Sequence, residues 1–103
     1  MRAVLFCRSP RNSVRALTVQ EERCRRKAAA AGAGTTVTIV DTEPDGKGLD
    51  RPAVVQLRRL LRDRLVDLVV ADTPNRLPRN IADLRAIGLD ISRAGVRLVF
   101  VSP

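Results

Sequence analysis

The chain contains no histidine, tryptophan or tyrosine, and its only aromatic side chains are Phe6 and Phe100. Without histidine, and with two cysteines that form no Cys-x-x-Cys pair, the sequence excludes an ordinary zinc site. We expect neither a metal ion nor any other cofactor. Two cysteines also cannot build a disulfide framework, so Cys7 and Cys24 are predicted to be small buried or half-buried thiols in a reducing compartment.

Long apolar runs are also missing. No stretch approaches the roughly 20 residues that a membrane-spanning helix needs. The short run from Ala3 to Cys7 is not followed by a small-residue cleavage site, so it is predicted to be a first strand rather than a signal peptide. These absences predict a cytoplasmic protein without a membrane partner.

What the chain does have is aliphatic side chains and positive charge. Its 103 residues are 45% hydrophobic, which predicts one globular domain, residues 1–103, with an aliphatic core. The net charge is +8, and of the nineteen basic residues only Lys27 and Lys47 are lysine. An excess of this size favours a polyanionic partner, because phosphate contacts release counterions.

Hydrophobic periodicity predicts alternating strands and helices. The first helix is expected after a capping box at Thr18–Glu21, and the second at Arg51–Pro52 with Asp50 as its cap. The third shows Ile81, Leu84, Ile87, Gly88 and Ile91 at helical spacing. The predicted strands are Arg2–Cys7, Thr35–Val40, Val66–Ala71 and Val96–Val101, and the predicted helices are Val19–Ala31, one beginning near Asp50, and one from Ile81 to about Ala94.

This order of elements predicts an α/β fold. Strands joined through helices by short connections favour a three-layer α/β/α arrangement around a mainly parallel four-stranded sheet with flavodoxin-like winding. All strand exits then share one edge of the sheet. The loops after Cys7, Val40, Ala71 and Val101 are therefore expected to meet there, as ligand-binding loops do in such folds.

The segment from Pro74 to Asn80 lies at one of these exits, between a strand and a helix. Its arginines, Arg76 and Arg79, are three residues apart and can present both guanidinium groups on one side of a first helical turn. The arrangement predicts a phosphate site. The alternative is that both arginines are solvated charges on an arginine-rich chain.

Ser9 follows the first predicted strand, where arginines would surround it. A hydroxyl among guanidinium groups suits phosphoryl transfer, since the arginines neutralise the nonbridging oxygens and favour the alkoxide without a histidine base. The alternative is a turn hydroxyl that hydrogen-bonds the backbone beside Pro10.

Five segments together resemble the catalytic domain of serine recombinases, the resolvase and invertase family. The resemblance spans nearly the whole chain in the family's order. The segments are Arg8-Ser9, Gln20-Glu21-Glu22-Arg23-Cys24-Arg25, Leu49-Asp50-Arg51-Pro52, Asn75-Arg76-Leu77-Pro78-Arg79-Asn80, and Ala94-Gly95-Val96-Arg97-Leu98-Val99.

The resemblance implies a resolvase-like fold that cleaves and rejoins DNA through a 5′-phosphoserine intermediate, in dimers or tetramers. It implies Ser9 as the nucleophile, and Asn75 and Asn80 as substrate-binding residues. The implied phosphate-binding arginines are Arg8, Arg51, Arg76 and Arg79.

The sequence departs from the family pattern in three ways. The family separates the arginine from the serine by one residue, whereas Arg8 and Ser9 are adjacent and Pro10 stands at the serine position. Asn75 stands where the family has an aspartate. The long dimer helix and the DNA-binding module that follow in the family are missing from residues 1–103. A second hypothesis is therefore an inactive resolvase-like module that binds nucleic acid or protein.

The segment from Cys7 to Pro10 also resembles part of a low-molecular-weight tyrosine phosphatase loop. That loop needs an arginine six residues after its cysteine, and this chain has Ser13 there. We therefore do not expect phosphatase activity.

Overall fold

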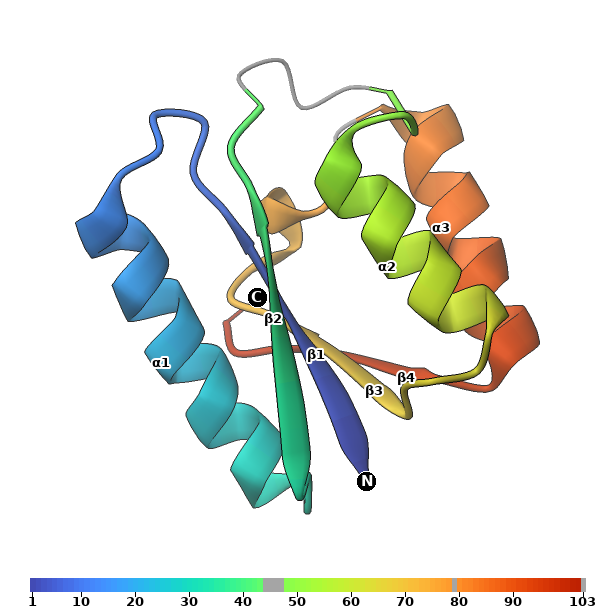
Figure 1. Ribbon diagram of the computed structural model, residues 1–103, viewed down its shortest axis with the longest axis horizontal. Coiled ribbons are helices and arrows are strands. Elements are labelled where there is room, and N and C mark those ends of the chain that lie inside the picture. The colour runs from blue at the N-terminus through green and yellow to red at the C-terminus, as the bar shows by residue number, and fades with distance from the viewer. Residues whose placement is uncertain (44–47, 79, 103) are drawn as a thin grey trace.

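The computed structural model describes residues 1–43, 48–78 and 80–102. Strands and helices alternate along the chain, and their connections are short (Figure 1). The elements are β1 (Arg2–Arg8), α1 (Val14–Ala30), β2 (Thr35–Asp41), α2 (Pro52–Arg62), β3 (Leu68–Ala71), the 3₁₀ helix η1 (Pro74–Arg76), α3 (Ile81–Ala94) and β4 (Arg97–Phe100).

The four strands form one parallel sheet in the order β2-β1-β3-β4. In the register, Val4 lies between Val37 of β2 and Val69 of β3. Because β1 and β3 have a strand on each side and helices on each face, their side chains are buried from Ala3 onward. The predicted parallel sheet and flavodoxin-like winding are therefore confirmed.

The helices cover the two faces of the sheet unequally. α1 lies on one face, and α2 and α3 pack side by side on the other (Figure 1). Alternate residues of β1 contribute to each side. The core beneath α1 consists of Ala3, Leu5, Cys24, Ala28, Leu68 and Val70. The larger core beneath α2 and α3 includes Val4, Phe6, Ile39, Val54, Leu57, Leu61, Val69, Ile87 and Ile91.

Cys7 and Cys24 are free and buried, as expected. They lie on the α1 side of the sheet, where their thiols share a hydrogen bond. That hydrogen bond and burial together raise the pKa of Cys24. Both cysteines therefore act as small core residues in this fold.

Helix α1 starts earlier than the capping pattern predicts. It begins at Val14, and Ser13 is the N-cap residue, whose Oγ accepts a hydrogen bond from Ala16 N at 3.2 Å. Thr18, the predicted cap, lies inside the helix and donates from Oγ1 to Val14 O at 2.8 Å. The prediction was wrong because the first turn is mostly solvent-exposed and shows no apolar periodicity, although Ser13 can cap it.

Several other boundaries also differ from the prediction. Helix α2 begins at Pro52 with Arg51 as its N-cap residue and no side-chain cap, so Asp50 does not cap it. Strand β3 begins at Leu68 rather than Val66. In α3, Ile81 and Leu84 are exposed despite their helical spacing, because only the stripe containing Ile87 faces the sheet. Strand β4 is limited to Arg97–Phe100.

Among the described residues, no helix is both long and apolar enough to cross a membrane.

Candidate active site at the carboxyl edge of the sheet

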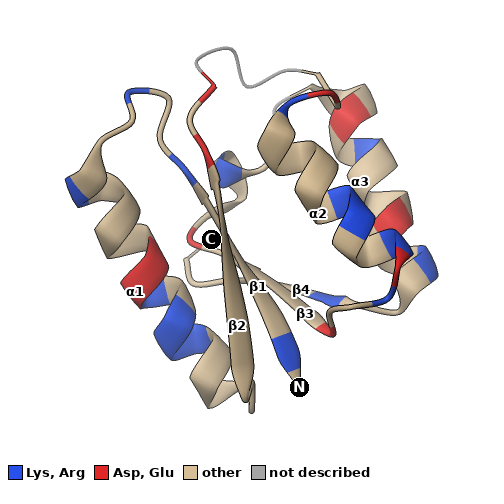
Figure 2. Cartoon of the chain, viewed as in Figure 1, with Lys and Arg blue, Asp and Glu red and all other residues tan. Residues whose placement is uncertain are grey.

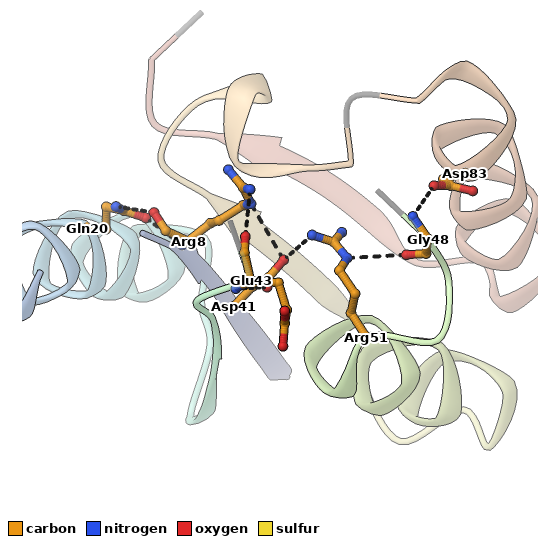
Figure 3. Close-up of polar contacts among 7 residues, drawn as sticks. All are labelled: Arg8, Gln20, Asp41, Glu43, Gly48, Arg51 and Asp83. Carbon is orange, nitrogen blue, oxygen red and sulfur yellow. Dashed lines mark hydrogen bonds and ion pairs between the residues drawn. The ribbon is translucent and has the colours of Figure 1, made fainter. Parts of the chain in front are cut away.

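The carboxyl ends of β1 and β2 place two opposite charges side by side. Arg8 is in register with Asp41, and both are buried, with 5% and 1% of their surfaces exposed. Arg51, at the N-terminus of α2, reaches the same carboxylate (Figure 3). Asp41 Oδ2 lies 2.7 Å from Arg51 Nη1 and 3.6 Å from Arg8 Nε. Asp41 therefore holds two guanidinium groups from distant parts of the chain.

Main-chain carbonyls hold the two guanidinium groups further in place. Arg8 Nη2 donates to Glu43 O at 2.9 Å, and Arg51 Nε donates to Gly48 O at 3.2 Å. Gly48 N in turn donates to Asp83 Oδ2 of α3 at 2.8 Å (Figure 3). These contacts join the end of β2 to the starts of α2 and α3, so both arginines have defined positions.

Arg51 retains unused hydrogen-bonding capacity. Its side chain is 6% exposed, and Nη2 has no hydrogen-bond partner among the described residues. The contact of Nη1 with Asp41 is short, but it is an ion pair without hydrogen-bond geometry. Buried polar groups normally have partners, so these N–H groups are unsatisfied donors within the described part of the chain.

Ser9 lies next to this arrangement in a tight turn. It is 5% exposed, its N–H donates to Asp41 O at 3.0 Å, and its Oγ accepts from Ser13 N at 3.0 Å. Asn12, with φ of 49°, closes the turn by donating from its N–H to Ser9 O at 2.9 Å. The Ser9 hydroxyl therefore hydrogen-bonds the backbone at the start of α1.

Gln20 fixes the end of β1 to α1. It is 2% exposed, Nε2 donates to Arg8 O at 2.8 Å, and Oε1 accepts from Arg8 N at 2.9 Å. Sequence reasoning assigned no role to Gln20 or Asp41. Gln20 lies four residues before Cys24 and eight before Ala28, on the buried face of α1, and this spacing could have indicated a buried polar role for Gln20. The position of Asp41, an acid directly after a predicted strand, could have indicated a role at the carboxyl edge of the sheet.

A second group of charges surrounds Asp72, after β3. Arg23 Nε of α1 donates to Asp72 Oδ1 at 2.7 Å, and Arg76 Nη2 lies 3.6 Å from Asp72 Oδ2. Arg23 Nη2 also donates to Ser102 Oγ at 2.6 Å. Asp72 and Arg76 line a hollow of about 380 Å³, together with Ser13, Arg15, Ala16, Val19 and Gln20.

The predicted arginines thus divide between two carboxylates. Arg8 and Arg51 meet at Asp41, whereas Arg76 pairs with Asp72. The sequence predicted that Arg76 and Arg79 lie on one side of a first helical turn. Arg76 belongs to η1 and not to the first turn of α3, so this prediction was wrong for Arg76. Pro78, which cannot donate a helical hydrogen bond, separates η1 from α3. Arg79 lies outside the described residues.

The two asparagines differ in their surroundings. Asn75 is exposed within η1. Asn80 is the N-cap residue of α3, and its Oδ1 accepts from Ala82 N at 2.8 Å and Asp83 N at 3.4 Å. The amide oxygen of Asn80 therefore stabilises the helix start.

In the part of the chain that the structure describes, no three His, Cys, Asp or Glu side chains form a group able to hold a metal ion.

Solved structures of recombinase catalytic domains have the same fold. The N-terminal catalytic domain of TP901-1 integrase matches at a TM-score of 0.82 and 20% identity, over 98% of this chain and 78% of that one. The C-terminal catalytic domain of ISC1926 TnpA, an IS607-like serine recombinase, matches at 0.80 and 24%, over 98% and 67%. That of IS1535 TnpA, also IS607-like, matches at 0.67 and 26%, over 100% and 71%.

No curated protein matches the sequence. The family model for the resolvase N-terminal domain does match it, over residues 3–103. This match extends from Ala3 in β1 through β4 and includes both groups of arginines described above. The chain therefore belongs to the resolvase N-terminal domain family.

Proposed function

We propose that this domain cleaves and rejoins DNA strands, and that it takes one phosphodiester at the carboxyl edge of the sheet. The observation that carries the proposal is the buried pair of Arg8 and Arg51, held on Asp41 beside Ser9. The fold shared with serine recombinase catalytic domains supports DNA as the substrate. The domain would act as a dimer or tetramer, as the family resemblance implies.

The arginines would bind the nonbridging phosphate oxygens. Arg51 brings a buried Nη2 without a hydrogen-bond partner, and Asp41 fixes the guanidinium before substrate arrives. Donors that are already oriented stabilise charge in a transition state with little reorganisation. Arg76 has a buried Nε that is likewise without a partner among the described residues. We propose that Arg76 contacts the side of the phosphate, and that Arg79 does so too, because of its position in the family motif. Asn75 and Asn80 would then lie near the DNA strand.

Ser9 is the proposed nucleophile. The Ser9 Oγ–phosphorus bond forms as the phosphorus–O3′ bond breaks, and O3′ takes up the proton that the Ser9 hydroxyl loses, leaving a 5′-phosphoserine and a free 3′-hydroxyl. The reverse reaction rejoins the strand. The hydrogen bond from Ser13 N, at the N-terminus of the 17-residue helix α1, favours the Ser9 alkoxide. Because Ser9 is 5% exposed, attack requires the groups that cover its hydroxyl to move aside while the hydrogen bond from Ser13 N is kept.

A second candidate function is a module that binds DNA without cleaving it. Two observations favour it: the Ser9 hydroxyl is buried in a backbone hydrogen bond, and Pro10 occupies the family's serine position. Such a module would keep the fold and the charges at the carboxyl edge but form no covalent intermediate.

Covalent trapping distinguishes the two functions. The chain is incubated with a pool of end-labelled, random-sequence DNA duplexes, the reaction is stopped with detergent, and protein-linked label is measured. We expect an adduct that Ser9→Ala abolishes. Arg51→Gln should reduce it about 10²- to 10³-fold, because one oriented donor group is lost. Circular dichroism checks that each variant is folded.

Ser92→Ala is the matched control, because Ser92 is exposed on α3, away from the carboxyl edge. It should leave the adduct unchanged. An adduct that persists in Ser9→Ala would exclude Ser9 as the nucleophile. DNA binding without any adduct, unchanged by Ser9→Ala, would instead establish the non-cleaving module.

A further inference from the structure

A second concentration of positive charge lies at the opposite edge of the sheet. It covers the C-terminal half of α2, the turn that follows it, and the end of α3 (Figure 2). The residues of this α2–α3 basic surface are Arg58, Arg59, Arg62, Arg64 and Arg93. They line two hollows of about 270 and 320 Å³ that share Arg58 and Arg62. The surface is therefore continuous rather than a set of scattered charges.

Few acidic groups balance this surface. Asp90 is 8% exposed and is already held by Arg58, whose Nε lies 2.7 Å from Asp90 Oδ2. The other acid that lines the hollows is Asp63. Within the described ranges, Arg59, Arg62 and Arg93 form no ion pair. The hollows therefore have an excess of positive charge that is available to an anion.

Helix ends explain only part of this arrangement. Arg59, Arg62 and Arg93 lie in the last turns of α2 and α3, where the helix dipole favours cations. Arg64 lies beyond the end of α2 and has φ of 55°, a left-handed conformation in which glycine or asparagine is preferred. Its carbonyl accepts from Arg2 Nη2 at 3.1 Å, which any residue could do. The N–H groups of Arg64 and Leu65 donate to Leu61 O and Leu60 O and close the end of α2, a role that glycine fills with less strain, so the helix end itself does not call for an arginine.

We infer that the α2–α3 basic surface binds the phosphate backbone of duplex DNA, at a site distinct from the phosphodiester taken at the carboxyl edge. A polyanion fits better than a single phosphate, because the charges extend across two adjoining open hollows. The inference rests on the proposed function for DNA as the partner, but it does not depend on the chemistry of Ser9.

The salt dependence of DNA binding tests this inference. Binding of the chain to a fluorescent 30-base-pair duplex is measured by anisotropy at several salt concentrations. The test variant is Arg62→Gln/Arg64→Gln/Arg93→Gln. Each phosphate contact contributes about 0.9 to the slope of log K against log salt, so we expect the slope to fall by roughly 2 to 3. Affinity at low salt should fall at least about tenfold.

The control removes the same charge from α1. Arg25→Gln/Arg26→Gln/Lys27→Gln changes three exposed residues on the other face of the sheet and should lower the slope by less than about 1. Equal losses in both triple variants would show that only net charge matters and would overturn the inference, as would an unchanged slope in the test variant. Ser9→Ala should keep the slope, so failure of the cleavage proposal would be recognised separately.

Arg64→Gly keeps the test informative if the triple variant folds poorly. Glycine adopts the left-handed conformation without strain, so this variant should unfold at a higher temperature than the parent. Its DNA affinity should nevertheless fall severalfold. A variant that is more stable and binds DNA as tightly as the parent would show that the Arg64 side chain makes no contact.

Discussion

At the scale of single residues, Asp41 organises the candidate active site. Its carboxylate is 1% exposed and lies between the guanidinium groups of Arg8 and Arg51, which are also buried. Burying one charge is unfavourable unless an opposite charge accompanies it. Asp41 therefore offsets the cost of burying both arginines, and the carbonyls of Glu43 and Gly48 help to fix their positions.

Replacing Asp41 should affect stability more than replacing an exposed acid. Asp41→Asn removes the buried carboxylate that contacts both guanidinium groups, so we expect the free energy of unfolding to fall by about 3–5 kcal/mol in urea denaturation. Glu22→Gln, which removes the exposed partner of Arg26, should change it by no more than about 0.5 kcal/mol. A loss below about 1 kcal/mol for Asp41→Asn would contradict this account.

The sequence predicted part of this site. It placed Arg8 and Arg51 at neighbouring strand and helix ends, and the structure brings them together because parallel strands end at one edge. It gave no role to Asp41, since an acid after a β-branched strand resembles the start of a loop. The hydrogen bond of Ser9 with Ser13 depends on the turn between them, and residue spacing alone does not determine that turn.

At the scale of secondary-structure elements, α1 shows how a cap determines where a helix starts. Ser13→Ala removes the Oγ that accepts from Ala16 N, so we expect a loss of about 1 kcal/mol in the free energy of unfolding. Thr18→Ala should not destabilise the protein, because Thr18 only donates to Val14 O within the helix. Urea denaturation of both variants checks this. A greater loss for Thr18→Ala would support the capping box that the sequence predicted.

Element types were easier to predict than element ends. The β-branched run of β2 and the leucines of α2 have clear periodicity, and the structure forms a strand and a helix there. The start of α1 has little apolar periodicity because its first turns lie on the surface, where Val14 is 77% exposed. In α3, Ile81 follows the helical spacing but is 73% exposed, since the buried residues of the helix begin only at Ile87.

At the scale of the whole molecule, the strand order predicts where the fold is most stable. Backbone amides in β1 and β3, which have a neighbouring strand on each side, should exchange hydrogen most slowly. Those in β2 and β4, at the two ends of the described sheet, should exchange faster. Native-state hydrogen exchange measured by NMR checks this order. Protection in β2 equal to that in β1 would indicate that another segment or a second copy covers the β2 edge.

The overall architecture was predictable because it depends on the order of elements rather than on their precise ends. Alternating strands and helices with short connections leave few parallel arrangements, since crossovers are right-handed. The unequal covering of the sheet was not predictable in detail. It arises because the chain moves from β1 outward to β2 and then back across to β3 and β4, so right-handed crossovers place α1 on one face and α2 and α3 on the other.

The two ends of the chain leave the sheet at opposite edges. Arg2 N donates to Asp67 Oδ2 at 2.7 Å at the amino edge, whereas Ser102 N donates to Asp72 O at 2.8 Å at the carboxyl edge. Ser102 lies beside Arg23 and Asp72, so an affinity tag attached directly after it would start at the edge of the sheet that holds the candidate active site. A tag at the N-terminus would leave that site open but would lie beside Arg64 of the α2–α3 basic surface, so it suits the cleavage test and not the test of that surface.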